Sequence, residues 1–320
     1  ASLRVEPSDA NICAVLAVTE QESGFRADPA VPQLGKIARQ EIDRRADAAG
    51  VPALAVRLAL QLSSPDGRSW EDRIEAVKTE RELSGLFEQM IDQLPLGKRL
   101  LAGYNPVRTG GPMQVGIAYA ESHARARPYP FPVRESIRQE VFTRRGGLYF
   151  GTAHLLDYAA SYGPAMVYRF ADFNAGQFAS RNAAFQAAVA IASGRTLDLD
   201  GDLIAPGTSG DSPPGETESA VRALGPALGL DAPEIRRELS RGEGPGFERS
   251  ALFTRVFELA ERRRDGQRLP RARVPDIPLK SPKFTRKLTT EWFARRVDER
   301  WQRCLKQAVA LGGSRAATAP

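Results

Sequence analysis

Glu22 is the residue of this chain whose position best suits acid–base chemistry. It closes a helix predicted from about Ser8 and is followed at once by the segment SGF. At helical spacing, the apolar stripe that leads to it consists of Ile12, Val15, Leu16 and Thr19. Because burial disfavours the charged form of a carboxyl group, a place on this stripe raises its pKa towards the range of a general acid working near neutral pH. The pattern therefore predicts Glu22 as a proton donor.

Two later segments, GGPMQVG and ADFNAGQ, carry groups suited to holding a polar ligand. In the first, the Gly110–Gly111 pair would let the backbone approach a ligand closely. Met113 would supply a soft apolar wall, and Gln114 an amide that pairs with hydroxyl or acetamido groups. In the second, Asn174 and Gly176 suit a tight turn, since both residue types tolerate left-handed backbone conformations. We expect both segments to line a binding groove.

In this order, QESGF, GGPMQVG and ADFNAGQ resemble the signature of the soluble lytic transglycosylases, lysozyme-like enzymes that cleave peptidoglycan. The family pattern is E-S-x-F, then G-x-M-Q, then A-Y-N-A-G. The segment GGLYFGTAHLLDYAASYG is similar to the helix that precedes the third motif in this family. The resemblance covers residues 8–30 and 105–192 and implies a lysozyme-like helical catalytic domain.

The resemblance also implies a mechanism with one carboxyl group. Glu22 would protonate the oxygen of the β-1,4 bond between N-acetylmuramic acid and N-acetylglucosamine, and would then take the proton of the C6 hydroxyl as a 1,6-anhydro ring closes. The implied substrate-binding residues are Ser23, Gly111, Met113, Gln114, Phe173, Asn174 and Gly176. The acids close to the motifs in sequence, Glu20, Asp28, Glu121 and Asp172, are predicted to be exposed. Neither a metal nor an organic cofactor is implied.

Three departures from the family pattern bear on activity. About sixty additional residues separate the first two motifs, which predicts a helical insertion that could cover the groove or bind a partner. Pro112 stiffens the second motif. Phe173 stands where the family usually has tyrosine, which removes a hydroxyl group that Tyr149, Tyr158 or Tyr168 could replace.

The periodicity along the chain predicts a mainly α fold, with a turn before a helix or short strand from Val115. We expect residues 1–30 and 105–195 to form the lysozyme-like core and residues 31–104 the insertion. Residues 196–320 should form a linker followed by a helical C-terminal region. One long helix is predicted from Ser69 to about Leu94.

Composition narrows the classes of partner. The chain of 320 residues carries 45 Lys and Arg against 39 Asp and Glu, a mild positive excess that favours anionic partners such as the cell-wall polymer. It has no basic block interleaved with aromatic residues, so nucleic acid is not expected. Cys13 and Cys304 could pair in an oxidising compartment or stay as two thiols. No zinc-type spacing occurs.

These features predict an enzyme of the Gram-negative periplasm, with an outer-membrane lipid anchor outside the given sequence as an open alternative. The expected partners are peptidoglycan strands and a cell-envelope protein bound through the insertion or the C-terminal region. Three other functions stay open: a peptidoglycan-binding scaffold without turnover, a hydrolase of the goose-type lysozyme or chitinase kind, and a helical adaptor.

Overall fold

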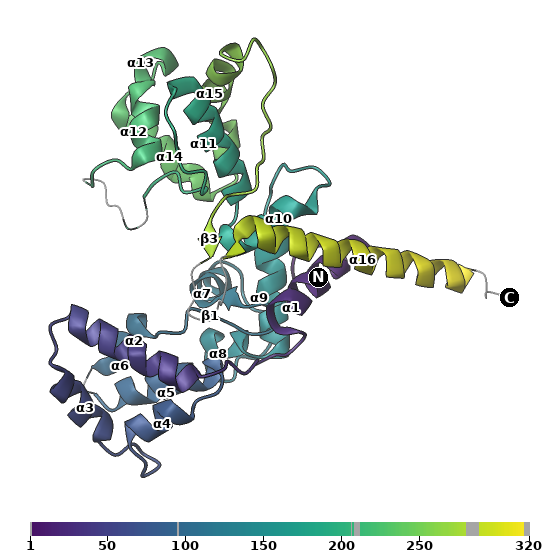
Figure 1. Cartoon of the computed structure of the whole chain (residues 1–320). Coiled ribbons are helices and arrows are strands. Elements are labelled where there is room, and N and C mark those ends of the chain that lie inside the picture. The colour runs from purple at the N-terminus through teal and green to yellow at the C-terminus, as the bar shows by residue number, and fades with distance from the viewer. Residues whose placement is uncertain (1, 95, 206, 208–211, 280–287, 317–320) are drawn as a thin grey trace. The chain divides into compact units, whose positions relative to one another are not determined.

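The chain is mainly helical, as predicted, in a computed structural model that describes residues 2–94, 96–205, 207, 212–279 and 288–316 (Figure 1). The described strands form two antiparallel hairpins, β1 (Thr109–Gly110) with β2 (Val115–Gly116) and β3 (Pro278–Leu279) with β4 (Leu288–Thr289). The chain divides into two compact units. We call Thr19–Gly151 the middle unit, and Leu3–Val18 together with Thr152–Pro320 the terminal unit. Each is described by itself.

This division differs from the predicted one. Residues 19–30 and 105–151 of the expected core share the middle unit with residues 31–104, whereas residues 3–18 and 152–195 belong to the terminal unit. The boundaries fall inside two helices, α1 (Asp9–Ser23) and α9 (Arg144–Leu156). Because both helices continue across the boundary, and Gly151 does not interrupt α9, no end of a helix marks the division in the sequence.

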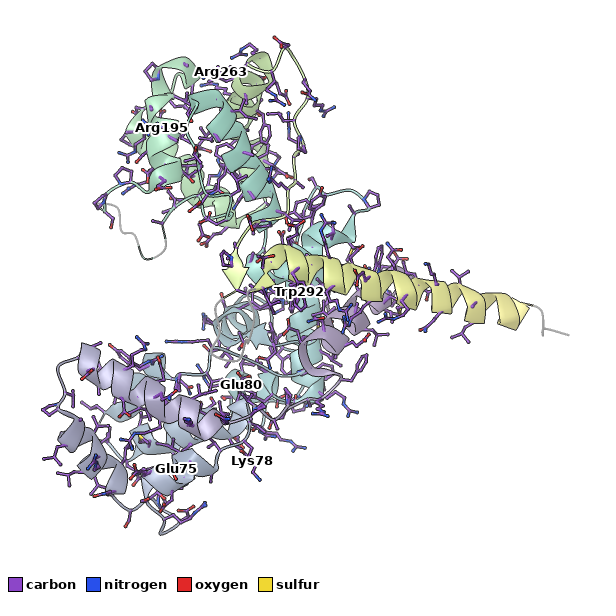
Figure 2. The ribbon with its side chains drawn as sticks, viewed as in Figure 1. Glu75, Lys78, Glu80, Arg195, Arg263 and Trp292 are labelled. Carbon is purple, nitrogen blue, oxygen red and sulfur yellow. A yellow bond between two sulfur atoms is a disulfide. The ribbon has the colours of Figure 1, made fainter. Side chains whose placement is uncertain are left out.

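The middle unit combines the inserted helices with the β1–β2 hairpin. Its helices are α2 (Leu34–Ala48), α3 (Ala53–Gln61), α4 (Trp70–Ala76), α5 (Glu80–Asp92), α6 (Gly97–Leu101), η1 (Ala102–Tyr104), α7 (Ile117–Ala126), α8 (Ile137–Val141) and the first part of α9. The predicted long helix from Ser69 is in fact two helices, α4 and α5. Lys78 lies in the break and Glu80 begins α5 (Figure 2). The break forms because Thr79 and Glu82 make a capping box that starts a new helix.

The terminal unit contains a helical core that follows α10 (Met166–Ala175). Its helices are α11 (Ala179–Ser193), α12 (Glu216–Ala223), α13 (Gly225–Leu228), α14 (Ala232–Leu239), η2 (Ser240–Glu243), η3 (Phe247–Arg249) and α15 (Ala251–Arg262). Phe185 of α11 stacks on Phe253 of α15, with ring centroids 5.7 Å apart. Leu203 is buried in the same core, and Asn182 donates a hydrogen bond to the Gly201 carbonyl. The first part of the predicted linker is therefore packed structure; residues 206 and 208–211 lie outside the described part.

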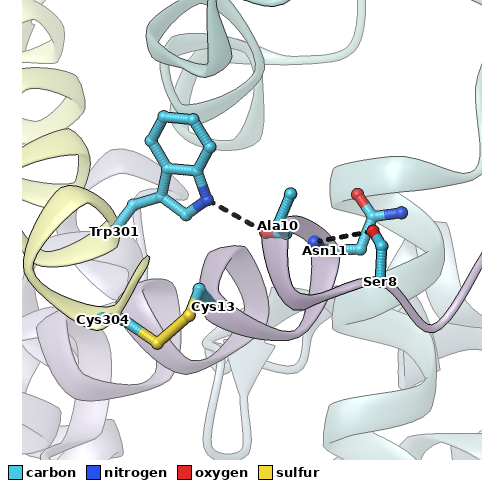
Figure 3. Close-up of a disulfide and its surroundings, with 6 residues drawn as sticks. All are labelled: Ser8, Ala10, Asn11, Cys13, Trp301 and Cys304. Carbon is cyan, nitrogen blue, oxygen red and sulfur yellow. Dashed lines mark hydrogen bonds between the residues drawn. A yellow bond between two sulfur atoms is a disulfide. The ribbon is translucent and has the colours of Figure 1, made fainter. Parts of the chain in front are cut away.

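A disulfide joins the two ends of the terminal unit. Cys13 of α1 is bonded to Cys304 of α16 (Thr290–Ala316), with 5.6 Å between their Cα atoms (Figure 3). Next to it, the indole nitrogen of Trp301 donates a hydrogen bond of 2.9 Å to the Ala10 carbonyl. Of the two alternatives for the cysteines, the structure contains the disulfide. Such bonds persist in oxidising compartments.

The predicted buried stripe of α1 is wrong for Ile12 and Leu16, whereas Thr19 is buried as predicted. Ile12 and Leu16 are 47% and 42% exposed, and the buried face consists of Cys13, Ala14, Ala17, Val18 and Thr19. Small side chains on this face let the helix pack closely, so the side that looks most apolar in sequence is not the buried one.

Candidate functional site

The end of α1 is fixed to the second motif by Ser23. The Ser23 side chain is buried, and its Oγ lies 2.8 Å from the Pro112 carbonyl oxygen and 3.1 Å from the Thr19 carbonyl oxygen. One hydroxyl proton serves one acceptor at a time, and the shorter distance favours Pro112. Because Pro112 is 89 residues further along the chain, this bond holds the segment that carries Glu22 against the GGPMQ loop.

Glu22 itself is half-buried in the last turn of α1. The chain then turns through two left-handed residues, Gly24 with φ 57° and Phe25 with φ 68°. A non-glycine residue in this region is strained and needs its surroundings to hold it there. Backbone hydrogen bonds hold this turn, since the N–H groups of Gly24 and Phe25 donate to carbonyl groups of the last turns of α1.

The second motif forms the tip of the β1–β2 hairpin. Gly111, Pro112, Met113 and Gln114 connect the strands, and the Gln114 N–H donates to the Gly111 carbonyl at 3.1 Å. Gln114 has φ 49°, a second strained non-glycine position. Its side-chain amide donates to Gly111 at 3.3 Å, and its Oε1 accepts from Thr109 at 3.3 Å. A helix or a short strand was predicted from Val115, and the chain forms a short strand, β2, followed by a helix, α7.

The glycines of this motif pack against protein. A Cβ on Gly110 would lie 2.3 Å from the Phe142 ring, and one on Gly111 would lie 2.0 Å from the Val141 carbonyl oxygen. We predicted that this pair lets the backbone approach a ligand; in the structure it lets the hairpin approach the residues that end α8. The requirement for glycine is thus explained by close packing.

Two glycines of α9 form the matching surface for the hairpin tip. A Cβ on Gly147 would lie 2.4 Å from Pro112 Cδ, and one on Gly151 would lie 2.4 Å from Met113 Sδ. Met113 has no exposed surface, so it anchors the loop in the interior and does not form an open apolar wall. The sequence contained the signal for this contact, because glycines four residues apart lie on one face of a helix.

The third motif lies in the terminal unit, at the end of α10. Asn174 is exposed in the last turn of this helix, and its Oδ1 accepts a hydrogen bond of 2.8 Å from Thr290. Gly176, with φ 117°, ends the helix and donates its N–H to the Asp172 carbonyl. The positive φ explains the need for glycine at this position, as the turn prediction required. Asn174 belongs to the helix and not to the turn.

Phe173 packs within the terminal unit and is 9% exposed. Its ring meets the His154 ring edge to face, with centroids 5.2 Å apart. Burial lowers the pKa of His154 to about 4. Of the tyrosines that could replace the missing hydroxyl, Tyr158 donates to Asp172 and Tyr149 packs in an aromatic cluster of the middle unit with Phe150.

Asp172 was predicted to be exposed, and this is wrong. It is completely buried and accepts hydrogen bonds from Tyr158 (2.9 Å) and Tyr162 (2.5 Å). The backbone N–H groups of Phe178 (2.9 Å) and Ser180 (2.7 Å) donate to the same carboxyl group. Burial raises the pKa of Asp172 and also those of both tyrosines. These bonds fix the turn from Gly176 to Phe178, which follows α10, so Asp172 is a structural centre that the sequence did not reveal.

The structure thus gathers the predicted site residues in two groups. Glu22, Ser23, Gly111, Met113 and Gln114 belong to the middle unit, and Phe173, Asn174 and Gly176 belong to the terminal unit. Within the described ranges, no cluster of three or more His, Cys, Asp or Glu side chains suits a metal ion. None of the helices in the described part is both long enough and apolar enough to cross a membrane.

This geometry defines a mainly helical protein of two units, with a strained and tightly packed hairpin beside Glu22. A family model described as "Protein of unknown function (DUF1615)" matches residues 1–307, and the chain belongs to this family. The chain is similar to "Uncharacterized protein YaiW" of Escherichia coli (strain K12), with 55% identity over 301 residues that cover 94% of this chain and 81% of that protein. No solved structure matches the chain. Its function is therefore inferred from its own residues.

Proposed function

We propose that this protein is a periplasmic lytic transglycosylase with a lysozyme-like catalytic region. It would cleave the β-1,4 bond between N-acetylmuramic acid and N-acetylglucosamine in peptidoglycan, and Glu22 would be its catalytic residue. The hydrogen bond from Ser23 to Pro112 carries this proposal, because it joins the first two motifs of the resemblance in one unit.

In the proposed reaction Glu22 acts twice. Its protonated carboxyl group donates to the glycosidic oxygen as the bond to C1 of the muramoyl residue breaks, with the neighbouring acetamido group assisting. The resulting carboxylate takes the proton of the muramoyl C6 hydroxyl, whose oxygen bonds to C1 and closes the 1,6-anhydro ring. Glu22 is again protonated, and no water is consumed.

The remaining site residues have supporting roles in this proposal. Ser23 and Met113 position the helix end and the hairpin from inside the middle unit. Gln114 offers its half-buried amide to a glycan once the bonds within its own loop exchange. Gly111 supports the hairpin from within the same unit, because it lets the loop approach the end of α8 closely. The Cys13–Cys304 disulfide supports the periplasmic location, because disulfides persist in oxidising compartments. A lipid anchor at the outer membrane would keep the protein in the same compartment.

Digestion of purified sacculi tests the proposal. Mass analysis should find anhydro-muropeptides with the wild type, and Glu22→Gln should lower their release by about 10²- to 10⁴-fold because the general acid is lost. Glu20→Gln is the matched control, since Glu20 lies on the same helix and is also half-buried. It should retain activity.

The same digestion separates the other functions. Products that have gained water would assign a lysozyme- or chitinase-type hydrolase. Binding to sacculi that survives Glu22→Gln without any product would assign a peptidoglycan-binding scaffold. Anhydro-muropeptides released equally by wild type and Glu22→Gln would remove Glu22 from the mechanism.

A further inference from the structure

A groove lies in the middle unit between α5 and α8, two helices that Figure 1 labels. It consists of three hollows of about 790, 660 and 370 Å³, and Glu135 and Gln139 line all three. The largest also borders the base of the β1–β2 hairpin, where Arg108 and Gly116 line it. Hollows of this size hold small ligands. The groove, which we call the α5–α8 groove, thus connects the inserted helices with the hairpin that carries Gln114.

The largest hollow has an excess of acidic side chains. Four acids line it against two arginines, Arg108 and Arg138. Arg138 lies 3.6 Å from Glu88 and 3.9 Å from Glu121, and it also donates to the Val107 carbonyl. Because two carboxylates share this guanidinium, negative charge remains at this end. An amine is the group that such an end attracts.

The smallest hollow has the opposite character. Arg81, Arg134 and Arg145 line it, together with Glu135 and Glu140. Glu140 is buried and accepts from the Tyr129 hydroxyl at 3.1 Å, and Arg145 lies 3.8 Å from it. Arg134 is exposed and makes no ion pair within the described part of the chain. A guanidinium in this situation is free to bind a carboxylate in the bidentate manner that arginine favours.

We propose that the α5–α8 groove binds the peptide stem of peptidoglycan, with its free amine at Glu88 and Glu121 and its terminal carboxylate at Arg134. The assignment of the peptide as a wall stem depends on the proposed function, since these stems hang from the glycan strand. The acidic and basic ends of the groove match a short peptide that carries an ammonium group and a carboxylate. A glycan without its peptide carries neither of these groups. The insertion then has a role, because α5 supplies one wall of the groove.

Calorimetric binding of the N-acetylated murein tetrapeptide to the full chain tests this inference. Arg134→Gln should weaken binding by about tenfold or more, the usual effect of losing a hydrogen bond between charged groups. Amidating the C-terminus of the peptide should weaken its binding to the wild type by the same factor as Arg134→Gln does. The amidated peptide should bind Arg134→Gln no more weakly than the unmodified peptide does, as expected in a double-mutant cycle for two groups that contact each other. Glu121→Gln should also weaken binding of the unmodified peptide. Acetylating the free amine of the peptide should weaken binding to the wild type and have no further effect on Glu121→Gln.

Arg57→Gln is the matched control, because Arg57 is exposed on α3 of the same unit and does not line the groove. It should bind like the wild type. Absence of binding by the wild type, equal loss in the control, or insensitivity to both peptide modifications would overturn the inference. The amidated and acetylated peptides are tested on the wild-type protein, so they decide the question even if a variant folds poorly.

The binding assay contains no glycan and needs no turnover, so its failure differs from failure of the proposed function. Anhydro-muropeptide release without peptide binding would overturn the groove assignment alone. Peptide binding with the predicted charge dependence, but without anhydro products, would support the groove and refute the chemistry of Glu22.

Discussion

Replacing Gly147 by alanine tests whether the hairpin tip is held against α9 as described. The added Cβ would lie 2.4 Å from Pro112 Cδ and 2.7 Å from the Val141 carbonyl oxygen. Ordinary contacts at these positions need roughly 3.4 Å or more, so the loop has to move by about 1 Å. Neither neighbour can rotate away, because one is a proline ring and the other is backbone.

The expected loss of stability follows from two opposing terms. Overpacking a filled interior costs about 1–3 kcal/mol. Alanine in place of a helical glycine contributes about 0.5–1 kcal/mol in the opposite direction. We therefore expect Gly147→Ala to lower the free energy of unfolding by about 1–2 kcal/mol. If Gln114 acts on substrate, a displacement of about 1 Å should also reduce turnover by up to about 10²-fold.

Gly85→Ala is the matched control. Gly85 lies within α5 of the same unit, and a Cβ there would have no atom within 4 Å. It should therefore gain about 0.5–1 kcal/mol from helix propensity alone. Urea unfolding followed by circular dichroism measures both variants. Gly147→Ala as stable as Gly85→Ala would refute the close packing of Pro112 on α9, whatever the enzyme activity.

Three further outcomes are expected. Replacing Cys13 and Cys304 by serine should lower the stability of the terminal unit by about 2–5 kcal/mol, since the bond closes a loop with a sequence separation of 291, and unchanged urea unfolding would contradict this. Burial lowers the pKa of His154 from 6.5 to about 4, so the neutral ring contributes to stability above pH 6.5. As the pH falls from 6.5 towards 4, the free energy of unfolding should decrease by up to about 3 kcal/mol. The unfolding of His154→Gln should lack this dependence on pH. Phe173→Tyr should raise anhydro-muropeptide release by about fivefold to tenfold if the missing hydroxyl limits turnover, and equal or lower release would indicate a site built around phenylalanine.

Local patterns predicted the elements of this fold where short-range chemistry decides them. Ser69 caps α4, as its place before two acids indicated. The division between α4 and α5 was missed although its signal, threonine followed by glutamate three residues later, stands at Thr79 and Glu82. A continuous apolar pattern concealed it, because neither glycine nor proline marks the break.

Long-range features were less accessible. Burial of Asp172 depends on donors from Tyr158 to Ser180, which only the folded chain brings to one carboxyl group. The buried face of α1 depends on small residues such as Ala14 and Ala17, whose contribution to packing is invisible on a hydropathy scale. The two-unit division depends on which elements share a core, and sequence order alone does not determine that.

Two positions of backbone strain lie on either side of the contact between the first two motifs. Phe25 and Gln114 both adopt left-handed conformations, at φ 68° and 49°, and each costs of order 1 kcal/mol or more. They lie in the two loops that Ser23 connects through Pro112. Left-handed backbone also occurs at Gln33, Leu96, Phe178 and Asp265, outside these two loops. What distinguishes Phe25 and Gln114 is the bond from Ser23 to Pro112 that joins their loops, so the two conformations and this bond together set where Glu22 lies relative to the hairpin tip.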